Sequence, residues 1–250
     1  MPESVLEKGL DKVKEILKPE AAPEKSKNPQ HLAITMEGAV AYAKKEGITL
    51  AESYKKCFTV ITNLLQIQTK WNIPILTISV LHERMKKDAE PFTALLEQLA
   101  LFLEQLKDNK AVHDHKIKVS VLGKWYNLPG KVVEPIKDII EATKDYDSFF
   151  LNLCINYNGQ EEIVDACKLI ARQIKADKLD ADLITKEVVK ENLYSSYFVP
   201  PDLVIKTGLR HEIPGLLLWD SMYAIIYFAE KYFPELTRKD IDRAVGLLGK

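Results

Sequence analysis

The sequence lacks the features of disulfide-stabilised, zinc-binding and nucleic-acid-binding proteins. Its three cysteines, Cys57, Cys154 and Cys167, are scattered without CxxC spacing. Each lies in an apolar or amphipathic stretch, which favours buried free thiols over disulfides or zinc ligands. The 250 residues carry a formal net charge of -1, without the positive surplus of a typical nucleic-acid binder. We therefore expect a soluble globular protein that does not bind nucleic acid.

Long hydrophobic runs and common catalytic motifs are also missing. The longest apolar runs, Leu216–Trp219 and Ala224–Ala229, fall far short of the ~20 residues of a membrane-spanning helix. Residues 1–11 lack the apolar core of a signal peptide, which predicts a cytoplasmic protein. No GxGxxG, GxxxxGK[ST], GxSxG or HExxH motif occurs, so these local signatures suggest no dinucleotide, P-loop, serine-hydrolase or zinc-protease site.

The N-terminal segment has a helical pattern of its own. Between Val5 and Leu17 six apolar residues recur at helical spacing, and the pattern ends at Pro19. Residues 20–30, EAAPEKSKNPQ, have no periodicity and indicate a linker. We therefore divide the chain into an amphipathic helix with a linker, 1–30, and one domain, 31–250. Packing of this helix as an arm is favoured over a membrane-surface helix, because its interleaved acidic residues weaken attraction to anionic lipid.

Short apolar runs alternate with helix-length patterns from His31 onward. Strands are predicted in HLAITM (31–36), ILTISVL (75–81), KIKVSVLG (116–123) and SFFLNLCI (148–155). Helices are predicted over 50–71, 92–106, 132–143 and 161–174. The apolar runs DLVIKT and LLLW and a closing helix follow, the helix beginning at Thr237 with Asp240 as its capping partner. This alternation predicts an α/β fold with a mostly parallel central sheet flanked by helices.

Two polar stretches could carry chemistry. The series His113, Asp114 and His115 resembles a metal-binding cluster, but it precedes a predicted strand without a third ligand in view, so a solvated loop is favoured. His82 and Glu83 end a predicted strand, at the edge of a parallel sheet where ligands bind. A lone His-Glu pair is common, and a structural or interface role is favoured there.

Four longer stretches change the interpretation when they are taken together. They are NPQHLAITMEGAVAYAKKEG, FLNLCINYNGQEEIVDACKLIA, PPDLVIKTG and LLLWDSMYAIIYF. In order and spacing they resemble the signature regions of the cis-prenyltransferases, the undecaprenyl diphosphate synthase family, over residues 31–250. The resemblance implies an undecaprenyl diphosphate synthase-like fold and a dimer built largely from the C-terminal third. It also implies elongation of an allylic diphosphate by isopentenyl diphosphate with magnesium.

The resemblance also implies which positions would hold magnesium and the diphosphates. In the family motif Met-Asp-Gly-Asn-x-Arg-Trp-Ala, this chain has Glu37 for the metal-binding aspartate, Ala39 for the asparagine and Ala41 for the phosphate-binding arginine. In the motif that receives isopentenyl diphosphate, a gap-free match gives Lys206 and Glu212 for two arginines and Pro214 for a serine. A shift in register would instead bring Arg210 to the position of Glu212. The second metal-binding carboxylate of the family corresponds to Ile225.

The aromatic and apolar pattern of the C-terminal region is retained. The resemblance assigns a partner interface to Leu216, Trp219, Tyr223, Tyr227, Phe228 and Gly249, with ordinary core packing as the alternative for the aromatic residues. Gly249 corresponds to the glycine of a C-terminal Arg-x-Gly motif whose arginine is missing here.

The chain lacks charged ligands of the family but retains its apolar positions. In this it resembles the non-catalytic, Nogo-B receptor type subunit of a heteromeric cis-prenyltransferase. We therefore predict a chain that holds no cofactor and pairs with a catalytic cis-prenyltransferase subunit, which binds the magnesium and makes long-chain polyprenyl diphosphate for glycosyl carrier lipids. A homodimer and peripheral membrane association are further options. The first alternative is a divergent active cis-prenyltransferase that uses Glu37 for magnesium, and the second is a protein that holds a polyprenyl chain without reacting.

Overall fold

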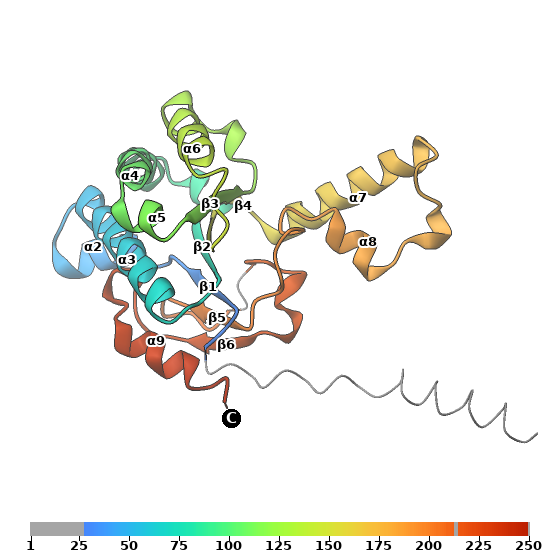
Figure 1. Ribbon diagram of the computed structural model, residues 1–250. Helices are drawn as coiled ribbons and strands as arrows, with labels where there is room; N and C mark the ends of the chain where they lie inside the picture. The colour runs from blue at the N-terminus through green and yellow to red at the C-terminus, as the bar shows by residue number, and fades with distance from the viewer. Residues whose placement is uncertain (1–27, 213–214, 250) are drawn as a thin grey trace, which may run out of the picture.

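A six-stranded sheet forms the centre of the computed structural model, which describes residues 28–212 and 215–249 (Figure 1). The strand order is β3-β4-β2-β1-β5-β6, and every neighbouring pair is parallel. The strands are β1 (His31–Thr35), β2 (Ile75–His82), β3 (Ile117–Leu122), β4 (Phe149–Tyr157), β5 (Leu203–Lys206) and β6 (Ile225–Phe228). The predicted parallel sheet is confirmed, and all its carboxyl ends lie at one edge.

Most helices lie between consecutive strands, and the four longest agree closely with predicted segments. The α-helices are α2 (Ala39–Glu46), α3 (Leu50–Lys70), α4 (Ala89–Lys107), α5 (Lys110–Asp114), α6 (Gly130–Ala142), α7 (Gly159–Lys175), α8 (Lys186–Glu191) and α9 (Arg238–Val245). Single turns of 3-10 helix are η1 (Glu83–Lys87), η2 (Trp125–Asn127), η3 (Ala181–Leu183), η4 (Asp220–Tyr223) and η5 (Phe233–Glu235). The capping box predicted for Thr237 and Asp240 is present at the start of α9.

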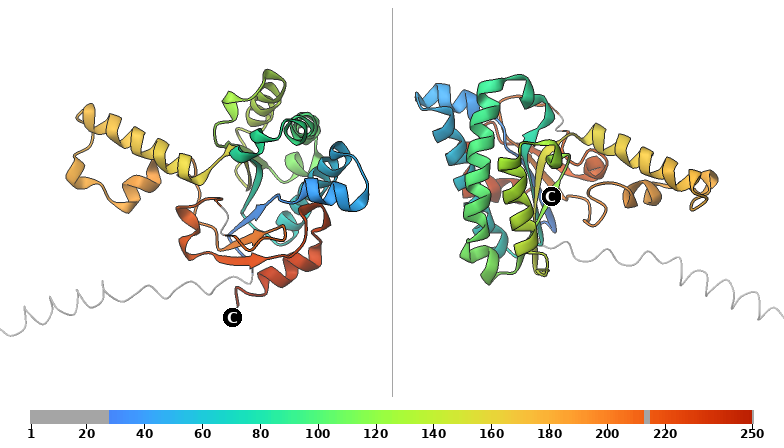
Figure 2. Two further views of the ribbon diagram at one scale, coloured as in Figure 1. Left: turned by 180° about the vertical axis from the view of Figure 1, so that it is seen from behind. Right: turned by 90° about the horizontal axis from the view of Figure 1, so that it is seen from above.

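The two faces of the sheet are covered differently. Alternate residues of β1 point to opposite faces, so Leu32 and Ile34 join the larger core while Ala33 joins a smaller one. The larger core packs the sheet against buried residues of α3, α4, α6 and α9. The smaller core packs it against Phe198, Leu216 and other residues of the chain on either side of β5. Helices α7 and α8 form an arm that projects from this second side (Figures 1 and 2).

The run Leu216–Trp219 does not form a strand. It forms a turn before η4, and Leu217 adopts a left-handed φ of 47°. Leu216 and Leu217 of this apolar run are buried in the smaller core. The sixth strand is β6 instead, which pairs with β5.

Two further expectations are corrected. His113 and Asp114 belong to the short helix α5, because the side chain of Asn109 caps its first turn, and His113 contacts the hydroxyl of Tyr146 and the carbonyl of Lys107. Cys167 is exposed on α7, whereas Cys57 and Cys154 are buried as predicted.

The predicted N-terminal helix and most of its linker, residues 1–27, lie outside the described residues. Within residues 28–212 and 215–249, no helix combines the length and apolarity that a membrane crossing requires.

A buried histidine joins β1 to the rest of the sheet. The ring of His31 contacts the Val199 carbonyl oxygen through Nδ1 at 2.6 Å and the Thr77 hydroxyl through Nε2 at 2.7 Å. A carbonyl only accepts, so Nδ1 donates, and the neutral ring accepts from Thr77. The Thr77 oxygen in turn accepts from the Asn152 amide at 3.2 Å. Burial lowers the pKa of His31 to about 4.

We predict that His31 makes the protein less stable in mild acid. The unfolded chain protonates this ring below about pH 6.5, whereas the folded protein resists protonation down to about pH 4. Between pH 7 and pH 4.5 the ring should therefore remove about 2–3 kcal/mol from the free energy of unfolding. Urea unfolding at both pH values should show this loss reduced in His31→Gln and unchanged in the control His115→Gln, at an exposed histidine. Equal losses in the wild type and His31→Gln would contradict the assignment.

Candidate functional site at the carboxyl edge of the sheet

A cavity of about 560 Å³ lies at the carboxyl edge of the sheet. Its walls come from the segments that follow β1 and β2, from Tyr157 at the end of β4 and from Lys206 at the end of β5. These four strands are neighbours in the order β4-β2-β1-β5. In parallel α/β sheets, ligands bind outside the carboxyl ends of the strands. This cavity is therefore the candidate functional site.

The floor of the cavity includes the first turn of α2. Gly38 precedes this helix with a left-handed φ of 89°, and a Cβ built on it would stand 2.3 Å from a ring carbon of Tyr232. Glycine is therefore required both for the backbone conformation and for the space. No described side chain caps this helix terminus, and its first turn has no acidic residue. An uncapped helix N-terminus favours an anion, because its N–H groups and the helix dipole are directed at it.

A partly buried ion pair lies beside the start of this helix, because Glu37 directly precedes Gly38. The Nζ of Lys206 donates to Oε2 of Glu37 at 2.5 Å and to the Thr207 carbonyl at 3.0 Å. The Lys206 side chain is only 3% exposed, whereas that of Glu37 is 45% exposed. The pair therefore consists of a buried ammonium and a carboxylate on the cavity wall. Glu37, which the resemblance assigns to the position of a metal-binding aspartate, thus neutralises a cation of the same chain.

Hydrogen bonds between β1 and β5 fix this pair. The Thr207 hydroxyl donates to the Thr35 carbonyl at 2.5 Å and accepts from the Glu37 N–H at 3.0 Å. The Thr207 N–H donates to the Thr35 hydroxyl at 3.0 Å. Gly208 follows with a φ of 90°, and a Cβ there would stand 3.3 Å from Oε2 of Glu37. Thr207 and Gly208 therefore help to hold the Glu37 carboxylate beside the Lys206 ammonium.

The other predicted substrate positions contribute little positive charge. Ala39 and Ala41 both line the cavity, where neither can donate a side-chain hydrogen bond. Glu212 also lines it and lies 3.5 Å from Arg210, whose side chain is 83% exposed and is not part of the lining. The gap-free match, which assigns Glu212 to the substrate position, therefore fits this geometry better than the shifted match, which assigns Arg210 to it. Pro214 lies outside the described residues.

The two positions assigned to metal ligands do not meet. Glu37 follows the carboxyl end of β1, whereas Ile225 begins β6 and pairs with Leu203, the first residue of β5. Ile225 therefore lies toward the opposite edge of the sheet. Within the described part of the chain, no three His, Cys, Asp or Glu side chains gather as metal ligands. Of these two positions only Glu37 carries a carboxylate at the cavity, so magnesium there would need water and substrate phosphates as its other ligands.

Sequence reasoning missed one polar group in the cavity wall. Tyr54 of α3 is fully buried, lines the cavity, and has a hydroxyl without a hydrogen-bond partner among the described residues. Burial raises the pKa of Tyr54, which keeps the hydroxyl protonated and able to donate. A tyrosine at an apolar position of an amphipathic helix gives no signal that distinguishes it from the core. Buried unpartnered hydroxyls are costly, so this group is a candidate ligand contact.

Two cations and a histidine also line the cavity. Lys44 of α2 and Arg84 of η1 line the cavity and are exposed to solvent. His82, at the end of β2, accepts a hydrogen bond from the Arg84 N–H at 3.1 Å. Burial and the charge of Arg84 lower the pKa of His82, so its ring is neutral at pH 7. His82 thus lies at the edge of the sheet, as predicted, and its ring accepts a local hydrogen bond from the backbone.

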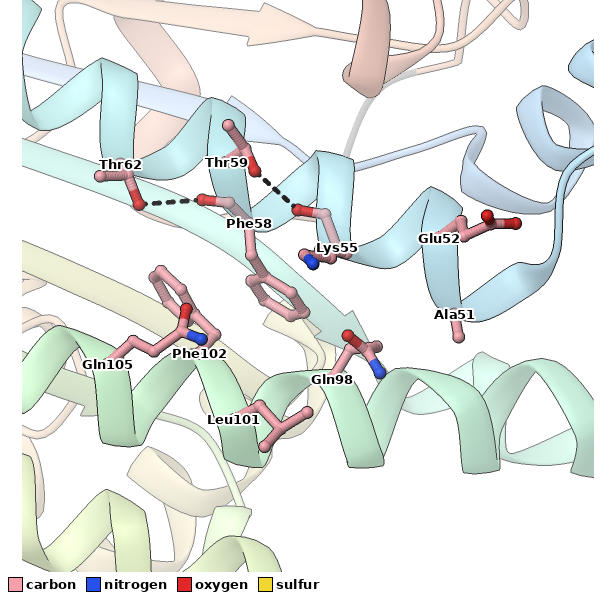
Figure 3. A pocket seen from close by; sticks show the side chains of 10 residues that line it. All are labelled: Ala51, Glu52, Lys55, Phe58, Thr59, Thr62, Gln98, Leu101, Phe102 and Gln105. Carbon is pink, nitrogen blue, oxygen red and sulfur yellow. Dashed lines mark hydrogen bonds between the residues drawn. The ribbon is translucent and has the colours of Figure 1, made fainter.

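A second groove lies outside this site, between α3 and α4. Figure 3 shows Phe58 and Phe102 between the two helices, with their ring centroids 4.6 Å apart in a stacked arrangement. Thr59 and Thr62 line this groove but donate their hydroxyl hydrogens to carbonyls of their own helix (Figure 3). The groove shares no lining residue with the cavity at the sheet edge. We assign no role to it.

The predicted interface residues fall into different environments. Trp219 and Tyr223 line a groove of about 980 Å³ between the α7–α8 arm and η4, and Tyr223 is 88% exposed. Leu216 is buried, while the side chains of Tyr227 and Phe228 are partly covered. Gly249 is exposed at the end of the described chain. Of the six predicted interface residues, two, Trp219 and Tyr223, lie together in this groove.

Comparison with known proteins identifies the family. The family model described as "Putative undecaprenyl diphosphate synthase" matches residues 35–247. The chain belongs to the cis-prenyltransferase family. Its first motif and its last helix thus both lie within the matched region.

Relatives of this cis-prenyltransferase family member include enzymes from archaea and bacteria. A "Tritrans,polycis-undecaprenyl-diphosphate synthase (geranylgeranyl-diphosphate specific)" of Methanocaldococcus jannaschii is 31% identical over 90% of this chain and 82% of its own. An "Isoprenyl transferase" of Thermotoga maritima is 30% identical over 89% of this chain and 94% of its own. These names are those of catalysts, which favours the alternative of an active enzyme. Nothing in them indicates a Nogo-B receptor type subunit.

Solved structures support the fold independently. Lavandulyl diphosphate synthase from Lavandula x intermedia, in complex with dimethylallyl diphosphate, superposes with a TM-score of 0.84 at 22% identity, over 89% of this chain and 95% of that one. A probable undecaprenyl diphosphate synthase from Campylobacter jejuni gives a TM-score of 0.71 at 24% identity, with the same coverage of both chains. At these identities the likeness establishes the fold alone.

We predict that the two sides of the ion pair respond unequally to substitution. Glu37→Gln leaves a buried ammonium without a counter-charge and should lower the free energy of unfolding by about 2 kcal/mol. Lys206→Met leaves Glu37 on the cavity wall, where water reaches it, and should cost less than about 1 kcal/mol. Urea unfolding of both variants and of the double variant measures the difference and the coupling. A larger loss in Lys206→Met than in Glu37→Gln would contradict this arrangement.

Proposed function

We propose that this chain is a non-catalytic subunit of a heteromeric cis-prenyltransferase, of the Nogo-B receptor type. Its partner would be a catalytic homologue that elongates an allylic diphosphate to a long-chain polyprenyl diphosphate, a precursor of glycosyl carrier lipids. The single observation that carries the proposal is the bond from the Lys206 ammonium to the Glu37 carboxylate. The group that the resemblance assigns to magnesium is engaged by a cation of the same chain.

Displacement of this pair by magnesium would be unfavourable. A divalent cation bound to Glu37 would lie close to the Lys206 ammonium, which is buried and has no other carboxylate among its hydrogen-bond partners. A divalent and a monovalent cation about 4 Å apart repel by roughly 8 kcal/mol at an effective dielectric constant of 20. Glu212, the other carboxylate of the lining, already pairs with Arg210. The proposal therefore expects this cavity to bind magnesium poorly.

The substitutions assigned by resemblance weaken diphosphate binding in the same way. A hydrogen bond to a charged group contributes about 1.5–3 kcal/mol. If alanine at 41, glutamate at 212 and proline at 214 replace two arginines and a serine, several kcal/mol are lost. At about 1.4 kcal/mol per factor of ten, affinity falls by orders of magnitude, before repulsion by Glu212 is counted.

The groove beside the arm offers a surface for the partner. Met222 and Tyr223 are 76% and 88% exposed at its rim, and Trp219 and Ile226 contribute to its lining. Exposed apolar patches rimmed by polar residues mark interaction sites, and aromatic residues and methionine are enriched in interface cores. Lys186, Glu187, Lys190 and Glu191 of α8 supply the polar rim. The proposed partner surface is thus this groove, and not the whole C-terminal third.

A second candidate is a divergent active cis-prenyltransferase, the alternative that the names of the relatives favour. A specific feature of the cavity supports it. The uncapped N-terminus of α2, the unpartnered Tyr54 hydroxyl and the cations Lys44 and Arg84 surround the same space. A diphosphate could bind on this side without displacing Lys206 from Glu37. The alternative therefore needs an anion subsite different from the one that the family motif implies.

We predict that the chain alone does not elongate prenyl diphosphates. The purified chain, a candidate catalytic homologue from the same genome, and their mixture would each be assayed for incorporation of labelled isopentenyl diphosphate with magnesium. Activity in the mixture should exceed the homologue alone at least tenfold, with co-elution of the two chains.

Magnesium-dependent turnover by this chain alone would overturn the proposal and favour the second candidate. In that case Tyr54→Phe and Arg84→Ala should each reduce kcat/KM, because both side chains would contact substrate. Stoichiometric binding of a polyprenyl phosphate by the chain alone, without turnover or a partner, would instead identify a carrier protein.

We also predict that the groove determines assembly. The double variant Met222→Asp, Tyr223→Asp places two charges on its apolar rim and should weaken association with the catalytic homologue at least tenfold. Tyr126→Asp, at a tyrosine of η2 that is 60% exposed and outside the groove, is the matched control. Affinities from titration by size-exclusion chromatography distinguish the two. Equal affinities would exclude the groove as the interface.

A further inference from the structure

A short turn separates the cavity at the sheet edge from the groove beside the α7–α8 arm. Gly215 and Leu216 line the cavity, and Leu218, two residues further along the chain, lines the groove. Leu217 lies between them and is buried in the smaller core. Residues 215–218 therefore contribute to the walls of both spaces.

The backbone of this turn is strained and is held by its neighbours. Leu217 has a φ of 47°, in the left-handed region that a bulky side chain disfavours, and its N–H donates to the Tyr157 hydroxyl at 3.1 Å. The Gly159 N–H, at the start of α7, donates to the Gly215 carbonyl at 3.1 Å. A Cβ on Gly159 would stand 2.5 Å from the same oxygen. The turn thus keeps its conformation because β4 and α7 fix it from outside.

A chain of hydrogen bonds connects the turn to the groove by a second route. Tyr157, which lines the cavity, donates its hydroxyl hydrogen to Oε2 of Glu162 at 2.5 Å. Oε1 of Glu162 accepts from the Ser195 N–H at 3.1 Å. The Ser195 hydroxyl and the Lys190 ammonium donate to Oδ2 of Asp220 at 2.7 and 2.6 Å. Because Lys190 and Asp220 line the groove, the chain runs from the wall of the cavity to the wall of the groove.

Water cannot replace the partners within this chain one at a time. Tyr157, Glu162 and Ser195 are each 1% exposed, and Asp220 is 6% exposed. A buried polar group that loses its partner is costly, because no solvent hydrogen bond takes its place. A displacement at the groove end that breaks one bond therefore forces the remaining bonds to rearrange.

We infer that the turn of residues 215–218 couples the groove to the cavity, so that a partner bound in the groove changes what the cavity admits. A partner that contacts Leu218 and η4 stabilises the strained conformation of the turn, which keeps Gly215 and Leu216 in the cavity wall. By linkage, a ligand that fits this form of the cavity strengthens binding of the partner by the same factor. The inference rests on the proposed function only for the identity of the partner.

Thiol labelling of the cavity wall tests the coupling in the chain alone. Cys167, the exposed native thiol, is replaced by serine, and Ser79→Cys places a small thiol in the cavity lining. Labelling with iodoacetamide, followed by peptide mass spectrometry, gives the rate at which the introduced thiol becomes accessible. Cys57 of the larger core reports opening of the whole domain, because it is buried and burial raises its pKa.

Lys190→Met, at the groove end of the chain, should raise the labelling rate of the introduced thiol at least fivefold without changing that of Cys57. The matched control Lys186→Met removes a cation of the same helix and the same groove lining. Lys186 makes no hydrogen bond or ion pair with the described residues, so its removal should leave the rate unchanged. Tyr157→Phe removes the hydroxyl that holds the turn and should raise the rate at least as much as Lys190→Met. Combining the two should add nothing further.

Equal labelling of the Lys190→Met variant and its parent chain would overturn the inference. Additive effects of Lys190→Met and Tyr157→Phe would also overturn it, because the groove would then act on the cavity by a route outside Tyr157.

The candidate catalytic homologue, added at saturation, separates this inference from the proposed function. It should slow labelling at least fivefold in the parent chain and not in Tyr157→Phe. Binding without this difference would overturn the coupling and leave the proposed function standing. Absence of binding would overturn the proposed function, whereas labelling of the chain alone would still decide the coupling.

Discussion

The buried ammonium of Lys206 constrains the candidate site more than any other group. A cation that is almost fully withdrawn from water requires a counter-charge, and Glu37 supplies it from the end of the neighbouring strand. The pair therefore joins β5 to the loop before α2, together with the hydrogen bonds of Thr35 and Thr207. Because the Glu37 carboxylate is bound to Lys206 of the same chain, what the cavity can bind depends on its other polar groups.

The polar groups of the cavity are of two unlike kinds. The carboxylate and the ammonium satisfy each other. A helix terminus without a side-chain cap, a buried tyrosine hydroxyl and two solvent-exposed cations still have hydrogen bonds to offer. The internal pair lies at positions that the resemblance assigns to the metal and to isopentenyl diphosphate, whereas the other groups are free to bind an anion. The names of the relatives favour an active enzyme, which would have to use these other groups.

Sequence periodicity predicted most of the sheet and its covering helices. The predicted helix 50–71 and the observed α3 differ by one residue, because its apolar face, Thr49 cap and final Trp71 are all local signals. The turn Leu216–Trp219 and the exposed Cys167 could not be predicted in this way. Whether an apolar residue packs in a strand, a turn or the surface of an arm depends on contacts that are distant in sequence.

Contacts between residues distant in sequence limit prediction of the candidate site even more. Glu37 and Lys206 are 169 residues apart, and each was assigned by resemblance to a different ligand. Their bond follows from the parallel pairing of β1 with β5, which places the ends of both strands side by side. The unpartnered hydroxyl of Tyr54 is likewise a property of the packed structure, because the polar groups within its reach depend on how α3 packs against the sheet. Motif matching identified the positions, and tertiary geometry determines what each can bind.

The position of β6 has a consequence for how the protein is handled in the cell. This strand ends the described sheet, so the outer side of its backbone is unpaired, and the large apolar groove lies beside it. Unpaired strand edges next to apolar surface are templates for aggregation. A surface that covered this strand edge and the groove would therefore also keep newly made chains from associating with one another.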